Sequence, residues 1–469
     1  MKKIAWTSLI ASIIISGLIL NMGNFLQNSE ADYQDYPVGS SSSDFWSKIV
    51  KEGRFFPLPY CELVNGSLYV IGMLELDDDP SRYIYVSKFN TSGHKEWEFS
   101  VDVGYTTRIS YVFDDDNNLF ILKNAYYSSD NVLLIKLNSS GALLFLKEFN
   151  LNLYDASLVL GENNSVLIVD KFYEHPNPDR FFILKFNNDG QFLWNITYYN
   201  EYDYNFPYIW TDFEHNIYIY FKNNSLYHLA KINGSGSILW QKSIGDRLEN
   251  LIVDSNDNLY LMGGKNYSTG YILKLNSIGN QVREILIEDF SYYDGEIWLK
   301  DDLFVFNSRF MSILCYDLNL DQKWNFSLSD YITPHFRFWI DLAKDSHDNV
   351  YVVQNDNLAN INLVKISSSG EFLSLIYWGG TSVEEVGYLN IDLDNNIYFI
   401  CNYIYHNVWN NRYEYAVLVK NPVNGGTHPE PRRDLDERDY FLFSVVGISC
   451  IISPIVLLSI LRSNKKRNG

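Results

Sequence analysis

Short runs in which apolar and polar residues alternate recur along most of the chain, and they follow the two-residue period of β-strands rather than the helical period. An acidic and polar turn precedes the clearest runs, which read DDDNNLFIL (114–122), DFEHNIYIY (212–220), DSNDNLYLM (254–262), DSHDNVYVV (345–353) and DLDNNIYFI (392–400). Looser copies read VNGSLYVIG, GENNSVLIV and KDDLFVF. The pattern predicts a β-protein built from repeats.

One aromatic or apolar residue after each turn anchors a repeat. The eight anchors, on average 47 residues apart, are Tyr69, Phe120, Leu167, Tyr218, Tyr260, Phe304, Tyr351 and Tyr398. Later in the repeat, a Gly follows a Lys by five residues and precedes a Trp or its substitute by four, as in Lys231, Gly236 and Trp240. This spacing predicts a β-hairpin, because Gly adopts positive φ without steric cost. The repeat CYDLNLDQKWNFSL departs from it: Asp321 stands near the Gly position and Trp324 comes one residue early.

Each repeat therefore contains four short antiparallel strands, which is the content of one propeller blade, and blades must stack around an axis to bury both faces. The eighth repeat lacks its fourth strand, because PVNGGTHPEPRRD stands in its place and is rich in Pro. The segment DFWSKIV (44–50) aligns with ILWQKSI, with Trp46 over Trp240. We therefore predict an all-β, eight-bladed β-propeller whose last blade is closed by an N-terminal strand.

The repeats resemble the SBBP-type β-propeller repeats of bacterial and archaeal surface and secreted proteins. The resemblance rests on the DxxxNxYV turn, the KxNxxG segment and the Trp that follows, and it covers roughly residues 44–421. It implies a role at the cell surface and carries no catalytic residue over to this chain.

Two uncharged segments flank the repeats. Residues 4–20 follow a basic start, as in a signal peptide or an uncleaved signal anchor. Residues 440–461 are long enough to span a bilayer, although a buried core helix is an alternative, and the basic tail after them favours the cytoplasm. The expected organisation is a signal segment (1–31), a linker (32–43), an extracellular propeller (44–421), a stalk (422–439), a C-terminal transmembrane helix (440–461) and a cytoplasmic tail (462–469).

The chain is strongly acidic, with a net charge of −20, and 46% of its residues are hydrophobic. Nucleic acid and anionic lipid surfaces are therefore poor partners for the exported part, since both carry negative charge. The four cysteines do not form a disulfide scaffold or a metal-binding spacing. Cys61 and Cys401 fall in the first and last blades, which closure makes neighbours, so a disulfide between them is a hypothesis.

The Asp-rich turns allow two interpretations, a calcium site and a structural turn. An EF-hand loop needs Gly at its sixth position and Glu at its twelfth, and counting from Asp392 gives Ile397 and Tyr403 instead. Asp and Asn are also favoured in tight turns, which makes the structural interpretation the stronger one. The segment YDYNFPYIW (202–210) presents aromatic residues either to the core or to a ligand on a propeller face.

The sequence contains no recognisable catalytic motif. The eight histidines show no metal-binding spacing, and they are His94, His175, His215, His228, His335, His347, His406 and His428. Nine N-x-S/T sequons make glycosylation plausible, and they start at Asn65, Asn90, Asn138, Asn163, Asn195, Asn223, Asn233, Asn266 and Asn325. We assign no catalytic, cofactor-binding or metal-binding residue, and we expect no cofactor.

The sequence favours a cell-surface module for recognition or adhesion, in which loops on one propeller face bind a protein or a glycan. Two alternatives remain open. One is an extracellular hydrolase or lyase with its site in the central channel, and the other is a structural component of the cell envelope.

Overall fold

The computed structural model describes residues 45–421, apart from 56–58, 77–78, 105–107, 125–130, 150–152, 154–155, 173–179, 200–208, 213, 224–225, 246, 267, 291–295, 333–339, 356–359, 380–382 and 407–411. The predicted signal segment (1–31), stalk (422–439), transmembrane helix (440–461) and tail (462–469) lie outside these residues. Within the described part of the chain, no helix has the length and apolar character needed to cross a membrane.

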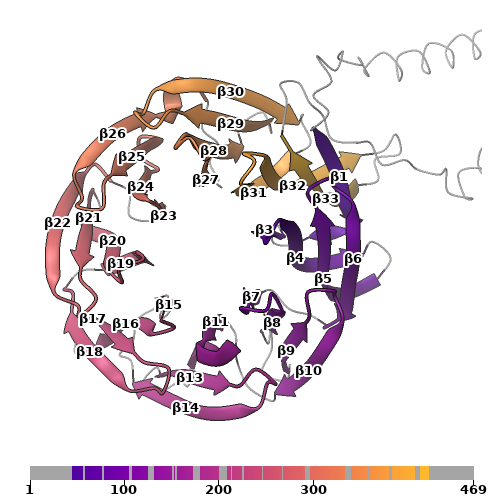
Figure 1. The fold of residues 1–469 in the computed structure, drawn as a ribbon, viewed down its shortest axis with the longest axis horizontal. Helices are drawn as coiled ribbons and strands as arrows, with labels where there is room; N and C mark the ends of the chain where they lie inside the picture. Colours follow the sequence, from indigo (N-terminus) through magenta and orange to yellow (C-terminus); the bar gives the residue numbers. More distant parts are fainter. Residues whose placement is uncertain are drawn as a thin grey trace, which may run out of the picture. The chain divides into compact units, whose positions relative to one another are not determined.

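Eight antiparallel sheets surround a central axis, one sheet per predicted repeat (Figure 1). The first strand of each sheet lies nearest the axis. These inner strands, from blade 1 to blade 8, are β3 (Tyr60–Val64), β7 (Ile109–Phe113), β11 (Ser157–Gly161), β15 (Ile209–Thr211), β19 (Arg247–Val253), β23 (Glu296–Lys300), β27 (Ile340–Lys344) and β31 (Val383–Ile391). The eight-bladed propeller predicted from the repeats is confirmed.

The second and third strands form the middle of each blade. The second strands are β4 (Ser67–Leu76), β8 (Leu119–Lys123), β12 (Ser165–Phe172), β16 (Ile217–Asn223), β20 (Leu259–Asn266), β24 (Asp302–Asn307), β28 (Val350–Asn355) and β32 (Ile397–His406). The third strands are β5 (Asp79–Asn90), β9 (Val132–Leu137), β13 (Arg180–Phe186), β17 (Leu226–Ile232), β21 (Thr269–Leu275), β25 (Ser312–Tyr316), β29 (Asn360–Ile366) and β33 (Arg412–Lys420). All eight anchor residues lie buried in second strands.

The fourth strands form the outer wall. They are β6 (Lys95–Asp102), β10 (Leu143–Phe149), β14 (Phe192–Tyr199), β18 (Ile238–Ser243), β22 (Gln281–Glu288), β26 (Gln322–Ser327), β30 (Phe372–Gly379) and, for blade 8, β1 (Trp46–Glu52). Blade 1 has one more short strand, β2 (Arg54–Phe55), beside β4. Two single 3-10 turns, η1 (Glu162–Asn164) and η2 (Leu328–Asp330), complete the described elements.

Strand β1 closes the ring by pairing with β33, although the two strands come from opposite ends of the propeller sequence. Trp46 lies opposite Lys420, as Trp240 lies opposite Lys231 in blade 4. The predicted alignment of DFWSKIV with the outer strands is therefore confirmed. One core cluster contains residues of both blade 8 and blade 1, including Tyr398 and Leu68, so closure also seals the hydrophobic core.

The Trp of one blade covers the Gly hairpin of the next blade. Gly93 has a φ of 79°, and a Cβ added there would lie 2.9 Å from the ring of Trp46. The Trp46 Nε1 also donates a hydrogen bond of 3.2 Å to the carbonyl of Thr91 in the same hairpin. The same pairing of ring and hairpin occurs for Trp97 with Gly141, Trp240 with Gly279 and Trp324 with Gly370. The recurring spacing of Gly and Trp within the repeats therefore serves a contact between repeats.

Blade 6 corrects one detail of the sequence alignment. Leu320, not Asp321, occupies the Gly position, with a φ of 66°, and Trp324 is in register opposite Cys315. The preceding blade has Arg283 where most blades have Trp, and Arg283 donates to the carbonyl of Asn319 and pairs with Asp321. A hairpin without Gly is thus matched by an outer strand without Trp.

Blade 7 shows the same correspondence from the opposite side. Its outer strand carries Ser374 opposite Lys365, where most blades have Trp. The next blade has no hairpin to cover, because its third and fourth strands are β33 and β1. The missing indole in blade 7 therefore coincides with the missing hairpin in blade 8.

The hypothesised disulfide between Cys61 and Cys401 is wrong, because both thiols are buried and free. Cys61 belongs to the core cluster between blades 8 and 1, whereas Cys401 belongs to the cluster between blades 7 and 8. The sheet of blade 8 therefore separates the two side chains. Closure makes their blades neighbours without bringing the sulfur atoms together.

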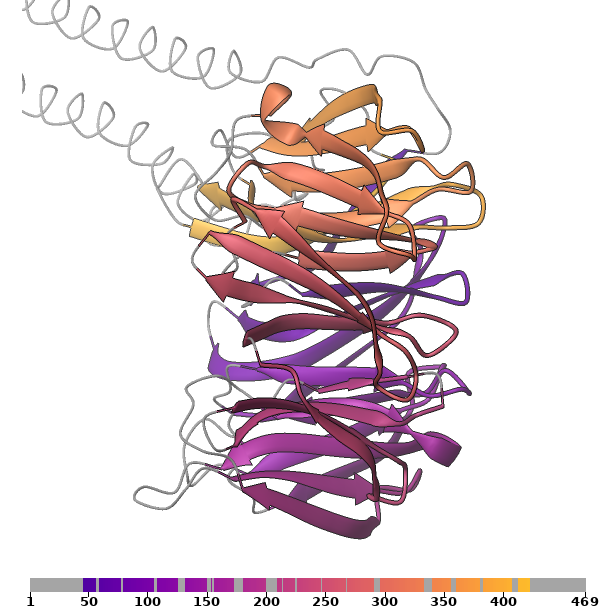
Figure 2. The same cartoon turned by 90° about the vertical axis from the view of Figure 1, so that its left-hand side faces the viewer.

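In blades 1 to 7, antiparallel pairing places the turn between the first two strands and the hairpin between the last two strands at the same end of the blade. The hairpins of successive blades follow one another along this side of the ring (Figure 2). We call it the turn face. The described chain also begins and ends there, since Trp46 is opposite Lys420 and Asn421 bonds to Ile397 beside the last Asp turn.

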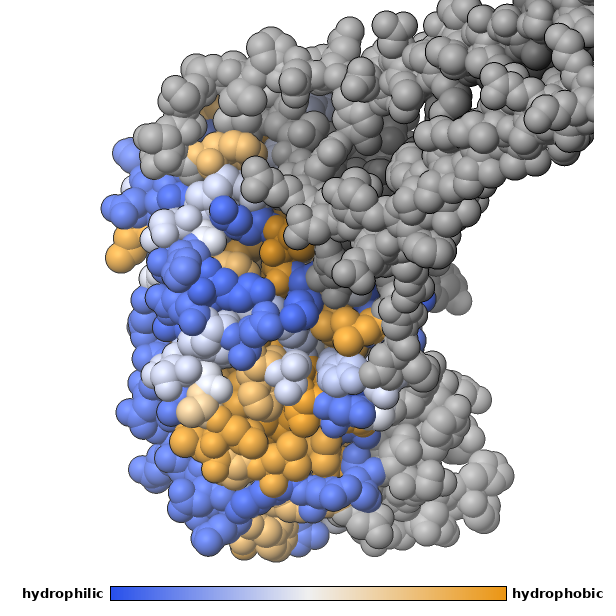
Figure 3. Space-filling view, turned by 90° about the vertical axis from the view of Figure 1, so that its right-hand side faces the viewer, coloured by the Kyte–Doolittle hydropathy of each residue, from blue (hydrophilic) through white to orange (hydrophobic). Residues whose placement is uncertain are grey.

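The outer wall presents apolar side chains to solvent, and a side view shows a hydrophobic patch between hydrophilic areas (Figure 3). Strand β6 alternates half-buried and exposed residues, as an outermost strand should. Exposed apolar residues of the outer strands include Leu143, Leu144, Leu146, Phe192, Leu193, Ile238, Leu239, Val282, Leu286, Phe372 and Leu373. These strands contribute to the core through one face only.

Polar contacts also attach the closing strand to blade 1. Lys51 forms an ion pair of 3.0 Å with Glu98, and Lys95 donates to the carbonyl of Val50 at 2.9 Å. Glu98 in turn accepts from Lys95 at 2.8 Å and from the Tyr85 hydroxyl at 2.9 Å. The carboxylate of Glu98 thus lies at the centre of a network that joins β1 to β5 and β6.

Adding a methyl group at Gly93 is expected to weaken closure. Gly93→Ala forces a Cβ against the Trp46 ring at a positive φ, whereas Gly66→Ala carries a similar backbone cost, at a φ of 72°, in open space. We expect Gly93→Ala to lower the free energy of unfolding by about 1–3 kcal/mol more than Gly66→Ala, because overpacking adds to backbone strain. Urea unfolding of the two variants measures the difference, and equal losses would contradict the contact.

Closure is also expected to depend on pH through Glu98. Hydrogen bonds, chiefly from Lys95, hold the pKa of Glu98 at about 2. A depressed folded-state pKa gives stability that is complete above the unfolded pKa, about 4.3, and is lost as pH falls through about 2. The stability difference between wild type and Glu98→Gln should therefore shrink in this window. Above this window the difference should be about 1 kcal/mol or less, because Lys95 and Glu98 are partly exposed. A difference that grows on acidification would contradict this role.

Candidate functional site

Each Asp turn is organised by the side chain of its first Asp. In blade 4, Asp212 Oδ1 accepts hydrogen bonds from the backbone N–H groups of Glu214 at 3.0 Å and Asn216 at 2.8 Å. The residue three positions after the Asp, His215, has a φ of 59°. The same acceptor pattern recurs at Asp114, Asp254, Asp345 and Asp392. The turns therefore use Asp for the reason that tight turns favour it.

A Lys from the third strand neutralises several of these carboxylates. Lys231 lies 2.8 Å from Asp212 and above the ring of the anchor Tyr218, at 5.2 Å from its centroid. Burial acts to raise the pKa of Asp212, but the hydrogen bonds from Lys231 and Asn216 outweigh it and hold that pKa below its usual value. Equivalent pairs join Lys136 to Asp114 and Lys365 to Asp345.

These contacts support the structural interpretation of the Asp turns. The first-position carboxylates at Asp114, Asp212, Asp254 and Asp345 are buried and already accept several hydrogen bonds. Among the residues that the structure describes, no group of three or more His, Cys, Asp or Glu side chains is placed to hold a metal ion.

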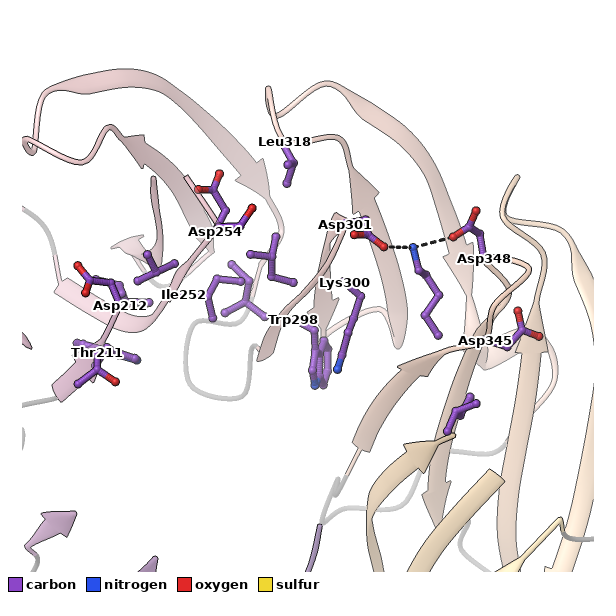
Figure 4. Close-up of a pocket in the computed structure, with 18 of the residues that line it drawn as sticks. Thr211, Asp212, Ile252, Asp254, Trp298, Lys300, Asp301, Leu318, Asp345 and Asp348 are labelled. Atoms are coloured by element: carbon purple, nitrogen blue, oxygen red, sulfur yellow. Dashed lines mark hydrogen bonds and ion pairs between the residues drawn. The ribbon is translucent and has the colours of Figure 1, made fainter. Parts of the chain in front are cut away.

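A cavity of about 1320 Å³ lies where the inner strands end at the turn face. We call it the mouth cavity. Its walls combine ends of inner strands with the turns beside them, and Figure 4 shows them in close-up. The lining residues include Asp115, Leu160, Trp210, Thr211, Asp212, His215, Ile252, Asp254, Ser255, Trp298, Lys300, Asp301, Leu318, Lys344, Asp345, Ser346, Asp348, Asp392 and Leu393. Seven blades thus contribute to one concave surface.

An ion-pair bridge crosses the edge of the mouth cavity between blades 6 and 7 (Figure 4). The Lys344 ammonium lies 2.8 Å from Asp301 and 2.8 Å from Asp348. Burial acts to lower the pKa of Lys344, but the hydrogen bonds to the two carboxylates outweigh it and raise that pKa. The carboxylates themselves are open to solvent, with 89% and 67% of their side chains exposed. Both are therefore available to a ligand.

A second pair of acids lies on the inner strands of the same two blades. Desolvation by the surrounding protein raises the pKa of Glu296, although part of this residue is exposed to solvent, and the negative charge of Asp341 raises it further. Burial also raises the pKa of Asp341, although its two oxygens accept backbone hydrogen bonds of 2.7 Å from Leu342 and Leu389. The Asp341 carboxylate is thus a structural acceptor that links β27 to β31.

Part of this site could be predicted from the sequence. From the aromatic segment 202–210, only Ile209 and Trp210 are described, and Trp210 lines the mouth cavity. Of the histidines, His215 reaches the cavity. The bridge of Asp301, Lys344 and Asp348 was missed. The available signal was the irregular turn KDDLFVF, in which Asp301 has a φ of 69° and the usual Asn is absent.

The similarities of this chain to known proteins are weak. No family model matches the sequence, and no curated protein matches it. A protein of unknown function from Bacteroides caccae is 11% identical, with a TM-score of 0.33 over 55% of this chain and 93% of its own. A polysaccharide lyase is 8% identical, with a TM-score of 0.39 over 83% and 95%. A prolyl endopeptidase is 10% identical, with a TM-score of 0.45 over 74% and 55%.

Proposed function

We propose that this protein is a recognition module of the cell surface, in which the propeller binds a protein or glycan ligand at the mouth cavity. In this proposal the segment 440–461 anchors the chain in the membrane, and the propeller lies outside the cell. The observation that carries the proposal is the mouth cavity itself, a concavity of about 1320 Å³ with both apolar and charged walls. Ligand sites are concave and combine these two kinds of surface.

The turns around the cavity are suited to binding because they are held rigidly. Asp254 fixes one turn through Asn256 and Asn258, and Asp392 fixes another through Asp394 and Asn396. Neighbouring turns are also joined, since Asn395 donates to the Ser346 hydroxyl at 2.8 Å. A preorganised surface loses little conformational entropy when a ligand binds.

An extracellular hydrolase or lyase is the second candidate, and the raised pKa values of Glu296 and Asp341 favour it, because a catalytic acid must be protonated near neutral pH. However, both oxygens of Asp341 already accept backbone hydrogen bonds. Among the described residues, the Asp341 carboxylate beside Glu296 is thus already engaged in the fold. Ligand recognition is therefore the better supported function.

Filling the mouth cavity is expected to abolish binding. In Ser255→Trp/Ser346→Trp, two indoles enter the cavity from exposed turn positions. The matched control, Ser140→Trp/Ser369→Trp, places two indoles on exposed outer hairpins. The purified full chain in neutral detergent is tested against a glycan array and a panel of synthetic peptides. The mouth variant should lose at least about tenfold in affinity for any ligand found, about 1.4 kcal/mol, and the control should not.

Equal binding by the mouth variant and wild type, with both variants melting like wild type, would contradict a site in the mouth cavity. Turnover of a bound glycan or peptide by wild type, lost in Glu296→Gln, would replace recognition by the enzymatic function.

A further inference from the structure

The charge of the mouth cavity is unbalanced. Seven of its described lining residues are aspartates: Asp115, Asp212, Asp254, Asp301, Asp345, Asp348 and Asp392. Four lysines oppose them, since Lys300 and Lys344 line the cavity and Lys231 and Lys365 pair with Asp212 and Asp345 from behind. An excess of negative charge remains, and walls of low polarity strengthen its field within the cavity.

Part of this negative charge is not required by the fold. The residue three positions after the first Asp of each turn adopts positive φ, and Asn and Asp both tolerate this conformation. Blades 2 and 8 place the neutral Asn117 and Asn395 there, whereas blades 5 and 7 place Asp257 and Asp348. Blade 6 adds Asp301 in the same left-handed conformation. Asp301 and Asp348 therefore place negative charge on neighbouring blades, at positions whose left-handed backbone conformation Asn would also adopt.

The bridge at Lys344 shows how this edge of the cavity holds a cation. Two carboxylates from different blades contact one primary ammonium, each at 2.8 Å. Lys344 has 11% of its side chain exposed, so it cannot satisfy the outer faces of Asp301 and Asp348. One positive charge between two negative charges leaves room for a second cation.

The walls of the mouth cavity also contain exposed apolar side chains, which favour a ligand with apolar groups. Leu393 stands at the tip of the blade 8 turn with 99% of its surface exposed, and the half-buried Trp298 on β23 lines the same cavity from blade 6. An exposed Leu in a turn has no role in the core of this protein. A small inorganic cation would use only the carboxylates, whereas a polypeptide segment would use both kinds of surface.

We propose that the ligand of the mouth cavity is a cationic polypeptide segment, with Lys or Arg side chains beside apolar residues. This inference rests on the proposed function, because it names the chemistry of the ligand at the same site. Asp301 and Asp348 contact the ligand's cationic groups, and Trp298, Leu318 and Leu393 contact its apolar groups. Long-range attraction by the acidic propeller raises the association rate and makes binding sensitive to salt.

The test measures binding of a short fluorescent peptide of Lys, Ala and Leu to the full chain in neutral detergent, with empty micelles as the blank. A matched peptide with Glu in place of Lys, a neutral maltooligosaccharide and calcium chloride serve as the other probes. We expect the Lys peptide alone to bind, and its affinity to fall at least about tenfold between about 50 mM and about 500 mM salt.

Three variants locate the contact. Asp301→Asn/Asp348→Asn should weaken the Lys peptide about tenfold or more, whereas Lys344→Met should tighten it several-fold, because it frees both carboxylates. The control Asp289→Asn/Asp321→Asn makes the same change in net charge at exposed residues away from the cavity, and it should alter affinity by less than about twofold. A merely structural bridge would make Lys344→Met weaken binding, and that result would overturn the inference.

Other outcomes separate this inference from the proposed function. If the Glu peptide or the maltooligosaccharide binds at the mouth and the Lys peptide does not, the cationic ligand is excluded while the recognition site stands. Calcium binding that Asp301→Asn/Asp348→Asn abolishes, without peptide binding, would also overturn the inference. If the Lys peptide binds the mouth-filled variant Ser255→Trp/Ser346→Trp as well as wild type, both the inference and the proposed site fail.

Discussion

The structure depends on the contact between the indole of one blade and the glycine hairpin of the next. At the junctions formed by Trp46, Trp97, Trp240 and Trp324, the hairpin bends through a left-handed Gly, and the ring lies where a side chain at that Gly would stand. The indole N–H then bonds to a carbonyl of the same hairpin, as Trp240 does to Ser277 at 3.1 Å. A Gly and a Trp four positions apart in the sequence therefore contact the two different neighbours of one blade, and repetition of the pair joins successive blades. Trp46 makes this contact across the point where the chain ends meet.

Ring closure connects this contact to the site. The inner strands of eight blades surround the axis in the closed ring, and seven of these blades together line the mouth cavity. The residues at its edge come from seven blades, and in five of these blades the turn is organised locally by its own first Asp. Hydrogen bonds within a turn therefore determine the shape of that turn, while ring closure determines how the turns of different blades face one another. A ligand site of this kind can vary in sequence without loss of the scaffold, because core residues and edge residues occupy different positions of the repeat.

Much of the fold could be predicted from the sequence, because the copies of the repeat can be aligned with one another and show a common spacing. The eight anchors, the four-stranded blades and the use of DFWSKIV as a closing strand all followed from the alignment of copies. Blade 6 was misaligned because Leu320 accepts a positive φ that the pattern reserved for Gly. The disulfide was wrong because adjacency of blades does not say which face of a sheet a cysteine occupies. The bridge between Asp301, Lys344 and Asp348 could not be predicted, since it depends on the distance between turns of separate blades.

The most direct test of the account is thermal unfolding of the full chain after deletion of residues 44–50. The deletion removes Trp46 and the buried Val50, bares the edge of β33 and opens the core between blades 8 and 1. Burying one indole and one aliphatic side chain amounts to several kcal/mol, so the melting temperature should fall by about 10 °C or more. Addition of a peptide with the sequence of residues 44–52 should restore part of the loss, as strand addition does in general. An unchanged melting curve would show that the ring does not depend on its N-terminal strand.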